Sequence, residues 1–136
     1  MEFVQFSLAG LGSFLGYYGL AVLFVVIYLA IYVRVTPYRE FALIREGNAA
    51  AAASVSGSLL GFVLPLASAI IHSVNPWDMA VWAVVALVVQ IVVYLVVRAL
   101  MPGIVHHIPQ GRVGAGVVLG AVSLAAGILN AACMSY

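Results

Sequence analysis

The sequence predicts an all-α membrane protein with four transmembrane helices, on the basis of its composition and the spacing of its charges. Of the 136 residues, 66% are hydrophobic and 7% are charged, whereas roughly a quarter of the residues in a soluble domain are charged. Four charge-free stretches, at 3–33, 47–77, 79–97 and 113–136, approach or exceed the ~20 apolar residues that cross a bilayer. This composition excludes a water-soluble enzyme, a nucleic-acid-binding protein and a disulfide-stabilised secreted domain.

The first span is expected from about Gly12 to Val35, because Pro37 disfavours a helical conformation at the residue before it. A short helix at the membrane surface is expected within 36–47, where charged and apolar residues are interleaved. Thr36 is its expected cap, and Pro37 would occupy its first helical position. The chain begins without the basic segment of a secretory signal, so the first span is expected to be retained.

The remaining spans follow from the other charge-free stretches. The turn between the second and third spans is expected at 72–78. Residues 102–111 contain two prolines, two glycines and two histidines, a composition typical of a loop. Spans two, three and four are therefore expected at about 48–71, 79–100 and 113–134.

The basic residues predict the orientation of the chain. All of them lie in or beside the first and third connections, and none lies near the second connection or either terminus. Basic residues in short loops favour the cytoplasmic side, so both termini are expected to face outward, away from the cytoplasm. These residues are Arg34, Arg39, Arg45, Arg98 and Arg112.

The two halves of the chain match weakly at an offset of 64 or 65 residues. Each half contains a long apolar span, a proline, a basic connection, a glycine and a span rich in small residues. We therefore expect one membrane domain, 1–136, built from two repeats of the same topology at about 12–71 and 79–134, related by an axis along the membrane normal. Matching pairs include Pro37 and Pro102, Gly47 and Gly111, and Ser58 and Ser123.

Three segments, Ile44–Ala52, Gly61–Ser68 and Leu129–Met134, resemble the YjfL-like family of bacterial inner-membrane proteins. The resemblance extends from about Tyr18 to Tyr136. It implies a four-span chain with two tandem copies of a domain of unknown function, an inner-membrane location and an envelope-stress context. It implies a fold and a location far better than an activity.

Small residues recur four apart on spans two and four, a spacing that lets helix backbones approach closely in a membrane. Two interpretations remain open, packing within one bundle and an interface between copies. Because the chain is too short to enclose much of a pathway alone, self-association into a homo-oligomer is expected. The residues concerned are Gly57, Gly61, Gly116, Gly120 and Gly127.

Polar side chains also occur inside the predicted spans. Gln90 lies near the middle of the third span, and Tyr94 and Arg98 continue its face at steps of four. An unpaired amide in hydrocarbon costs several kcal/mol, so these groups either hydrogen-bond between helices or line a path for an ion or solute. The candidates are Ser54, Ser58, Gln90, Ser123 and Asn130.

The cytoplasmic ends of spans two and four form the candidate binding surface. Both helix N-termini point to the cytoplasm with free backbone N–H groups, next to basic side chains. Anionic phospholipids are the simplest partner, and an anionic ligand or a cytoplasmic envelope-stress protein is the alternative. The residues are Arg39, Arg45, Gly47, Asn48 and Arg112. The aromatic residues, Tyr28 and Tyr32 among them, are expected near the membrane surface as anchors.

Other chemistry is not expected. No acidic residue falls inside a predicted span, because even Glu40 is assigned to a connection, and this argues against a proton or sodium antiporter. The three histidines and Cys133 do not share a level in the membrane, so no metal site, cofactor or catalytic residue is predicted. The net charge of +1 gives no reason to expect nucleic acid as a partner.

Two functions from different classes remain. The first is a homo-oligomeric, channel-like or transport element for an ion or small solute. The second is a non-conducting membrane scaffold in the envelope-stress response, which would bind anionic lipid or a cytoplasmic partner. Neither function requires enzymatic activity.

Overall fold

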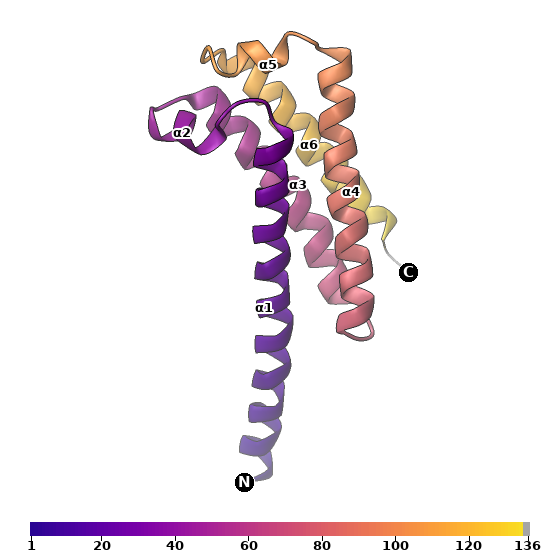
Figure 1. Cartoon of the computed structure of the whole chain (residues 1–136). Coiled ribbons are helices and arrows are strands. Elements are labelled where there is room, and N and C mark those ends of the chain that lie inside the picture. The colour runs from indigo at the N-terminus through magenta and orange to yellow at the C-terminus, as the bar shows by residue number, and fades with distance from the viewer. Residues whose placement is uncertain (135–136) are drawn as a thin grey trace.

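The computed structural model describes residues 1–134, which form helices joined by short connections (Figure 1). Four helices are long and apolar enough to cross a membrane, and the described residues contain no β-strand. The prediction of an all-α, four-span membrane protein is therefore confirmed. The helices are α1 (Glu2–Val35), α2 (Glu40–Arg45), α3 (Ala49–His72), α4 (Pro76–Leu100), α5 (Ile104–His107) and α6 (Val113–Cys133).

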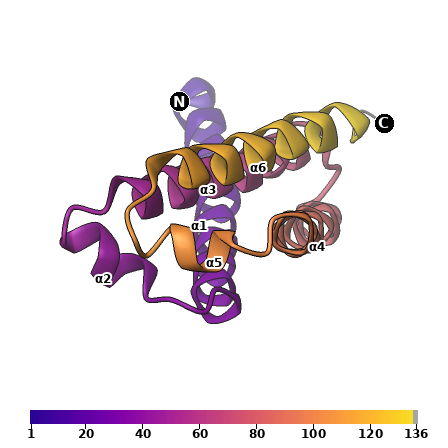
Figure 2. The ribbon, with the colours of Figure 1, turned by 90° about the horizontal axis from the view of Figure 1, so that it is seen from above.

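Helices α3 and α6 form the centre of the bundle and run side by side in the same direction (Figure 2). Hydrogen bonds join the two helices at corresponding levels, from Ser58 to Ser123 and from Ser68 to the carbonyl of Ala131. Helix α4 packs against both of them, and α1 packs against α3 and α4. The short helices α2 and α5 lie together at the end of the bundle opposite the N-terminus (Figure 1).

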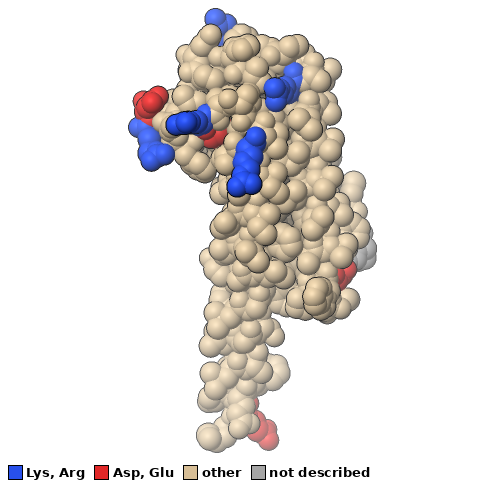
Figure 3. Space-filling model, in the orientation of Figure 1, with Lys and Arg blue, Asp and Glu red and all other residues tan. Residues whose placement is uncertain are grey.

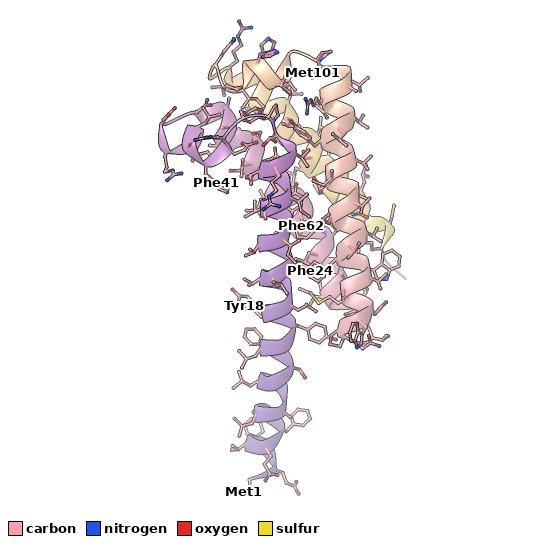
Figure 4. The ribbon with its side chains drawn as sticks, viewed as in Figure 1. Met1, Tyr18, Phe24, Phe41, Phe62 and Met101 are labelled. Carbon is pink, nitrogen blue, oxygen red and sulfur yellow. The ribbon has the colours of Figure 1, made fainter. Side chains whose placement is uncertain are left out.

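Helix α1 is much longer than the predicted first span. It begins at Glu2, not near Gly12, because residues 2–11 contain no proline and continue the apolar helical pattern. At ~1.5 Å per residue its 34 residues measure about 50 Å, compared with ~30 Å for the hydrocarbon core. Its first part extends beyond the other helices, as the position of Met1 shows (Figure 4).

The first connection differs from its prediction at one point. Thr36 does not cap the surface helix, because Thr36 has an extended backbone (ψ 137°) and ends α1, whose Tyr32 carbonyl accepts its N–H. Pro37 forces this extended conformation on Thr36, so the chain turns before α2 begins at Glu40. The predicted short helix exists, but it starts three residues after Pro37.

The second and third connections also contain more helix than predicted. Helix α4 starts at Pro76, not Met79, because Asn75 caps it by accepting the N–H of Asp78 at 2.9 Å, while the Asp78 carboxylate accepts the N–H of Val74 at 3.1 Å. Proline is favoured at the first helical position. The expected loop at 102–111 contains the one-turn helix α5.

The two short helices end in turns of the same geometry. Gly47 and Gly111 have φ of 87° and 77°, a region that favours glycine. In the first turn the N–H of Gly47 donates to the carbonyl of Ile44, and the N–H of Asn48 donates to the carbonyl of Leu43. The residues 64 positions later make the same two hydrogen bonds in the second turn. This pattern is a Schellman motif. The tandem-repeat arrangement itself remains a prediction.

Candidate functional site

The five glycines singled out by their spacing lie at the contact between α3 and α6. A Cβ atom on Gly57, Gly61, Gly116 or Gly127 would overlap backbone atoms of the facing helix, and Gly120 faces Ala53 in the same way. Close backbone approach of this kind maximises packing in a membrane. Because this face is covered within one chain, the glycines are not available as a surface for a second copy.

Gln90 bridges α4 to both central helices. Its side chain is 1% exposed, and its amide nitrogen donates to the carbonyl of Gly61 at 2.9 Å and to that of Ser123 at 3.0 Å. The Gly61 carbonyl would normally accept the N–H of residue 65, but Pro65 has none. Gln90 therefore satisfies a carbonyl that the helix itself leaves free, while its own amide oxygen has no partner within the described residues.

The predicted polar residues do not all meet. Ser58 and Ser123 are buried and in contact, with 3.4 Å between their hydroxyl oxygens, and the Gln90 amide reaches the backbone of Ser123. Ser54 donates to the carbonyl of Ala51, one turn earlier in α3, at 3.0 Å. Asn130 lies near the other end of α6 and is half-buried. Only Ser58, Gln90 and Ser123 thus form one group.

A carboxylate is buried at the end of the bundle where α2 packs. Glu40 is 1% exposed, and neither of its carboxylate oxygens has a hydrogen-bond partner among the described residues. Burial raises the pKa of the Glu40 carboxyl to about 8, from 4.5, and the nearby hydroxyls of Tyr38 and Thr36 offset part of this effect. A buried, unpaired carboxylate in a membrane protein indicates a functional site.

Four tyrosines surround the carboxylate of Glu40 within electrostatic range. Their hydroxyl groups are buried and unpaired in the described structure. The rings pack tightly: Tyr28 stacks on Phe62 at 4.6 Å between centroids, and Tyr32 meets Tyr94 edge-on at 5.7 Å. Figure 4 shows Phe62 at the level where α1 and α4 flank α3. The four tyrosines are Tyr28, Tyr32, Tyr38 and Tyr94.

A pocket of about 410 Å³ opens next to this cluster at the end of α1. Its lining includes Thr36, Tyr38 and Glu40, together with the exposed Arg39 and Arg45. The buried oxygens thus begin at a pocket and continue inward through the tyrosines to Ser58 and Gln90. We call these residues the Glu40 cluster: Glu40, Tyr28, Tyr32, Tyr38, Tyr94, Ser58, Ser123 and Gln90.

Comparison with known proteins gives the family of this chain. The family described as Domain of Unknown Function (DUF350) matches residues 5–134. The chain belongs to the DUF350 family. No solved structure matches it.

Two relatives from different bacteria are similar to this chain. The chain is 42% identical over 124 residues to the UPF0719 inner membrane protein YjfL of Escherichia coli (strain K12), which covers 91% of this chain and 94% of that protein. It is 31% identical over 90 residues to the UPF0719 transmembrane protein YshE of Bacillus subtilis (strain 168), covering 63% of this chain and 64% of that protein. The predicted YjfL-like membership is confirmed.

The DUF350 chain contains buried tyrosines where the sequence suggested surface anchors. Tyr28 and Tyr32 are at most 1% exposed, because α1 turns this face toward α3 and α4. Glu40 lies in the first connection and outside the four spans, as predicted. Its burial was not predicted, and it arises because α2 packs against α3. One sequence signal could have predicted that the tyrosines are buried. Tyr28 and Tyr32 are four residues apart, as are Gln90 and Tyr94, so each pair lies on one face of its helix.

The residues predicted at the basic end have different roles. Asn48 caps α3 by accepting the N–H of Ala51 at 3.0 Å, and its amide donates to the carbonyl of Ile108 at 2.9 Å, joining the two halves. Arg112 precedes α6 without a side-chain cap. Arg39, Arg45 and Arg112 are exposed, and the blue side chains in Figure 3 gather at this end.

The DUF350 chain shows no metal-ligating group within residues 1–134, that is, no cluster of three or more His, Cys, Asp or Glu side chains. Cys133 is exposed near the end of α6. The oxygens of the Glu40 cluster are instead hydroxyl, amide and carboxylate groups, which suit hard cations and protons better than soft metals.

Proposed function

We propose that this chain is an inner-membrane transport element for a small ion, and that the Glu40 cluster forms the inner half of its pathway. The observation in favour is the line of unpaired buried oxygens from Glu40 through the tyrosines to Gln90. Buried polar groups are normally hydrogen-bonded, so unpaired ones need a specific explanation. Water or a permeant ion within the cluster would supply the missing partners.

The outer half of this path is closed in the present conformation. Beyond the level of Gln90, the bundle is filled by apolar side chains that are at most 2% exposed. Transport would therefore require a movement that separates these side chains, as in alternating access. The apolar residues are Phe62, Leu66, Ala69, Met79, Ala83 and Ala86.

The orientation and assembly belong to the same proposal. The names of the relatives support an inner-membrane location, and the arginines favour a cytoplasmic position for α2 and α5. Cysteines introduced at Asn75 and Gly103 would then be labelled from opposite sides. A homo-oligomer would use the exposed apolar first part of α1, because the glycines are covered by α3 and α6.

Flux measurements in proteoliposomes test the transport function. Purified wild-type protein should accelerate the movement of protons, sodium or potassium above that of protein-free liposomes, and Gln90→Leu should reduce this flux. Gln5→Leu, at an exposed position on α1, is the matched control. Flux by the wild type equal to that of empty liposomes for all three ions, under an imposed membrane potential, would contradict the proposal.

The scaffold function remains the second candidate, because the arginines form one basic end (Figure 3). Each basic residue near an anionic surface contributes about 1 kcal/mol to lipid binding. Native mass spectrometry would then find fewer retained anionic lipids on Arg39→Gln and Arg112→Gln than on the wild type. Equal retention of anionic lipid by the wild type, Arg39→Gln and Arg112→Gln would contradict the scaffold function.

A further inference from the structure

The Glu40 carboxylate is buried without a positively charged partner in the described structure. Glu40 is the first residue of α2, and this helix packs on α3 so that the side chain is buried. Neither carboxylate oxygen is hydrogen-bonded in the described residues. An ionised carboxylate in such surroundings is strongly disfavoured unless a positive charge accompanies it.

The groups that face Glu40 from each neighbouring element are predominantly neutral oxygens. Helix α1 contributes Tyr28 and Tyr32, the first connection contributes Thr36 and Tyr38, and α4 contributes Tyr94. From α3, Ser54 and Ser58 lie beside the tyrosine hydroxyls.

Three arginines complete the surroundings. Arg98 lies beside Tyr94, and Arg39 and Arg45 line the pocket. None of them hydrogen-bonds to the carboxylate of Glu40 in residues 1–134. The positive charge that would neutralise Glu40 therefore has to come from outside this set of side chains.

We propose that Glu40 and the hydroxyls of Tyr28, Tyr32, Tyr38 and Tyr94 form a binding site for one monovalent cation, a proton or an alkali-metal ion that competes with it. A single carboxylate is neutralised by a single positive charge, whereas a divalent ion would leave an excess charge in a low-dielectric site. Hydroxyl and carboxylate oxygens can replace the water around a hard cation, as carbonyl oxygens do in ion channels.

A pocket lies next to the site. Glu40, Thr36 and Tyr38 are among the residues that line this pocket of about 410 Å³, while both carboxylate oxygens of Glu40 are themselves closed to solvent. A cation from the α2 end would enter by a movement of these side chains and would not cross the apolar outer half. The raised pKa of Glu40, about 8, is consistent with a carboxyl that exchanges a proton near neutral pH. The inference deepens the proposed transport function and rests on it for its physiological meaning.

Infrared spectroscopy of the reconstituted full chain tests binding directly, because a protonated carboxyl has a carbonyl band that a carboxylate lacks. Between about pH 5 and pH 9, the wild type should lose such a band with a midpoint near 8. Glu40→Gln should lack this transition, and Glu46→Gln, at an exposed glutamate in the same segment, should retain it. Identical titrations of the wild type and Glu40→Gln would overturn the proposal.

The choice of salt distinguishes a proton from an alkali-metal ion as the ligand. A second variant, Tyr38→Phe, tests the site without replacing Glu40. If sodium or potassium binds, it should lower the midpoint relative to choline, while an unchanged midpoint identifies the proton as the only ligand. Tyr38→Phe removes a hydroxyl that stabilises the carboxylate and should raise the midpoint by about one pH unit. Tyr18→Phe, at an exposed tyrosine, should leave the titration midpoint unchanged. Equal midpoints for the Tyr38→Phe and Tyr18→Phe variants would count against the site.

The titration and the flux assay test different claims. A cation that binds at Glu40 without any measurable flux would refute only the transport function.

Discussion

The side-chain amide of Gln90 donates at 2.9 Å to the carbonyl of Gly61, which Pro65 leaves without its helical donor. This hydrogen bond links the middle of α4 to α3 at the level where Ser58 meets Ser123. Gln90 therefore holds helices together through its amide nitrogen, and it belongs to the Glu40 cluster through its amide oxygen, which has no partner within residues 1–134.

A double-mutant cycle measures this relationship. Gln90→Leu should lower the free energy of unfolding by about 1 kcal/mol, near the upper range for interhelical bonds in membranes. In a Pro65→Ala background the loss should be smaller by at least ~0.5 kcal/mol, because the new backbone N–H can satisfy Gly61. Reversible unfolding in mixed micelles provides the measurement. Additive effects of the two substitutions would show that Gln90 does not compensate for Pro65.

The glycines between α3 and α6 should be sensitive to the smallest possible side chain. Gly116→Ala should destabilise the protein by ~1–3 kcal/mol, because its Cβ would overlap the backbone of Ala50 and force the helices apart. Gly19→Ala, which meets open space in α1, should be neutral or stabilising by up to ~1 kcal/mol. Thermal unfolding in detergent compares the two variants. A similar Tm for both would contradict the packing described here.

The equivalent positions Asn48 and Arg112 should respond differently to alanine. Asn48→Ala removes a helix cap and the bond to Ile108, and should cost about 1–2 kcal/mol. Arg112→Ala removes no capping bond and should cost much less. Chemical unfolding of both variants is the test, and a larger loss for Arg112→Ala would show that the caps are assigned to the wrong residues.

The spans could be predicted from the sequence because charges are excluded from hydrocarbon, and the surface helix because its charges alternate with apolar residues. Pro37 allowed the end of α1 to be predicted. The start of α4 was predicted three residues late, although Asn75, Pro76 and Asp78 form a typical helix start of a capping residue, a proline and an acidic first turn. The glycine faces were identified, whereas their partner was not, since spacing alone does not distinguish a neighbouring helix from a second copy. Glu40 was missed because its burial depends on how α2 folds onto α3, a long-range contact.

The pH dependence of stability should reveal the buried carboxyl. The folded chain holds the Glu40 proton up to a pKa of about 8, compared with 4.5 for the solvent-exposed carboxyl in the unfolded chain. Since the folded state then binds more protons than the unfolded state, the free energy of unfolding should fall as the pH rises between these values, by up to ~1.4 kcal/mol per pH unit. Glu40→Gln should remove this slope, and Glu46→Gln should keep it. The three histidines contribute equally to both variants, so the same slope in the two variants would contradict a buried, ionisable Glu40.

An experimental structure in a lipid bilayer, at a resolution that reveals ordered water and ions, examines the Glu40 cluster most directly. We predict density for water or a bound cation between the Glu40 carboxylate and the hydroxyls of Tyr32 and Tyr94, in contact with the pocket at Thr36 and Tyr38. A dry cluster, with Glu40 turned out to solvent and the tyrosine hydroxyls bonded to one another, would contradict an ion site in this protein.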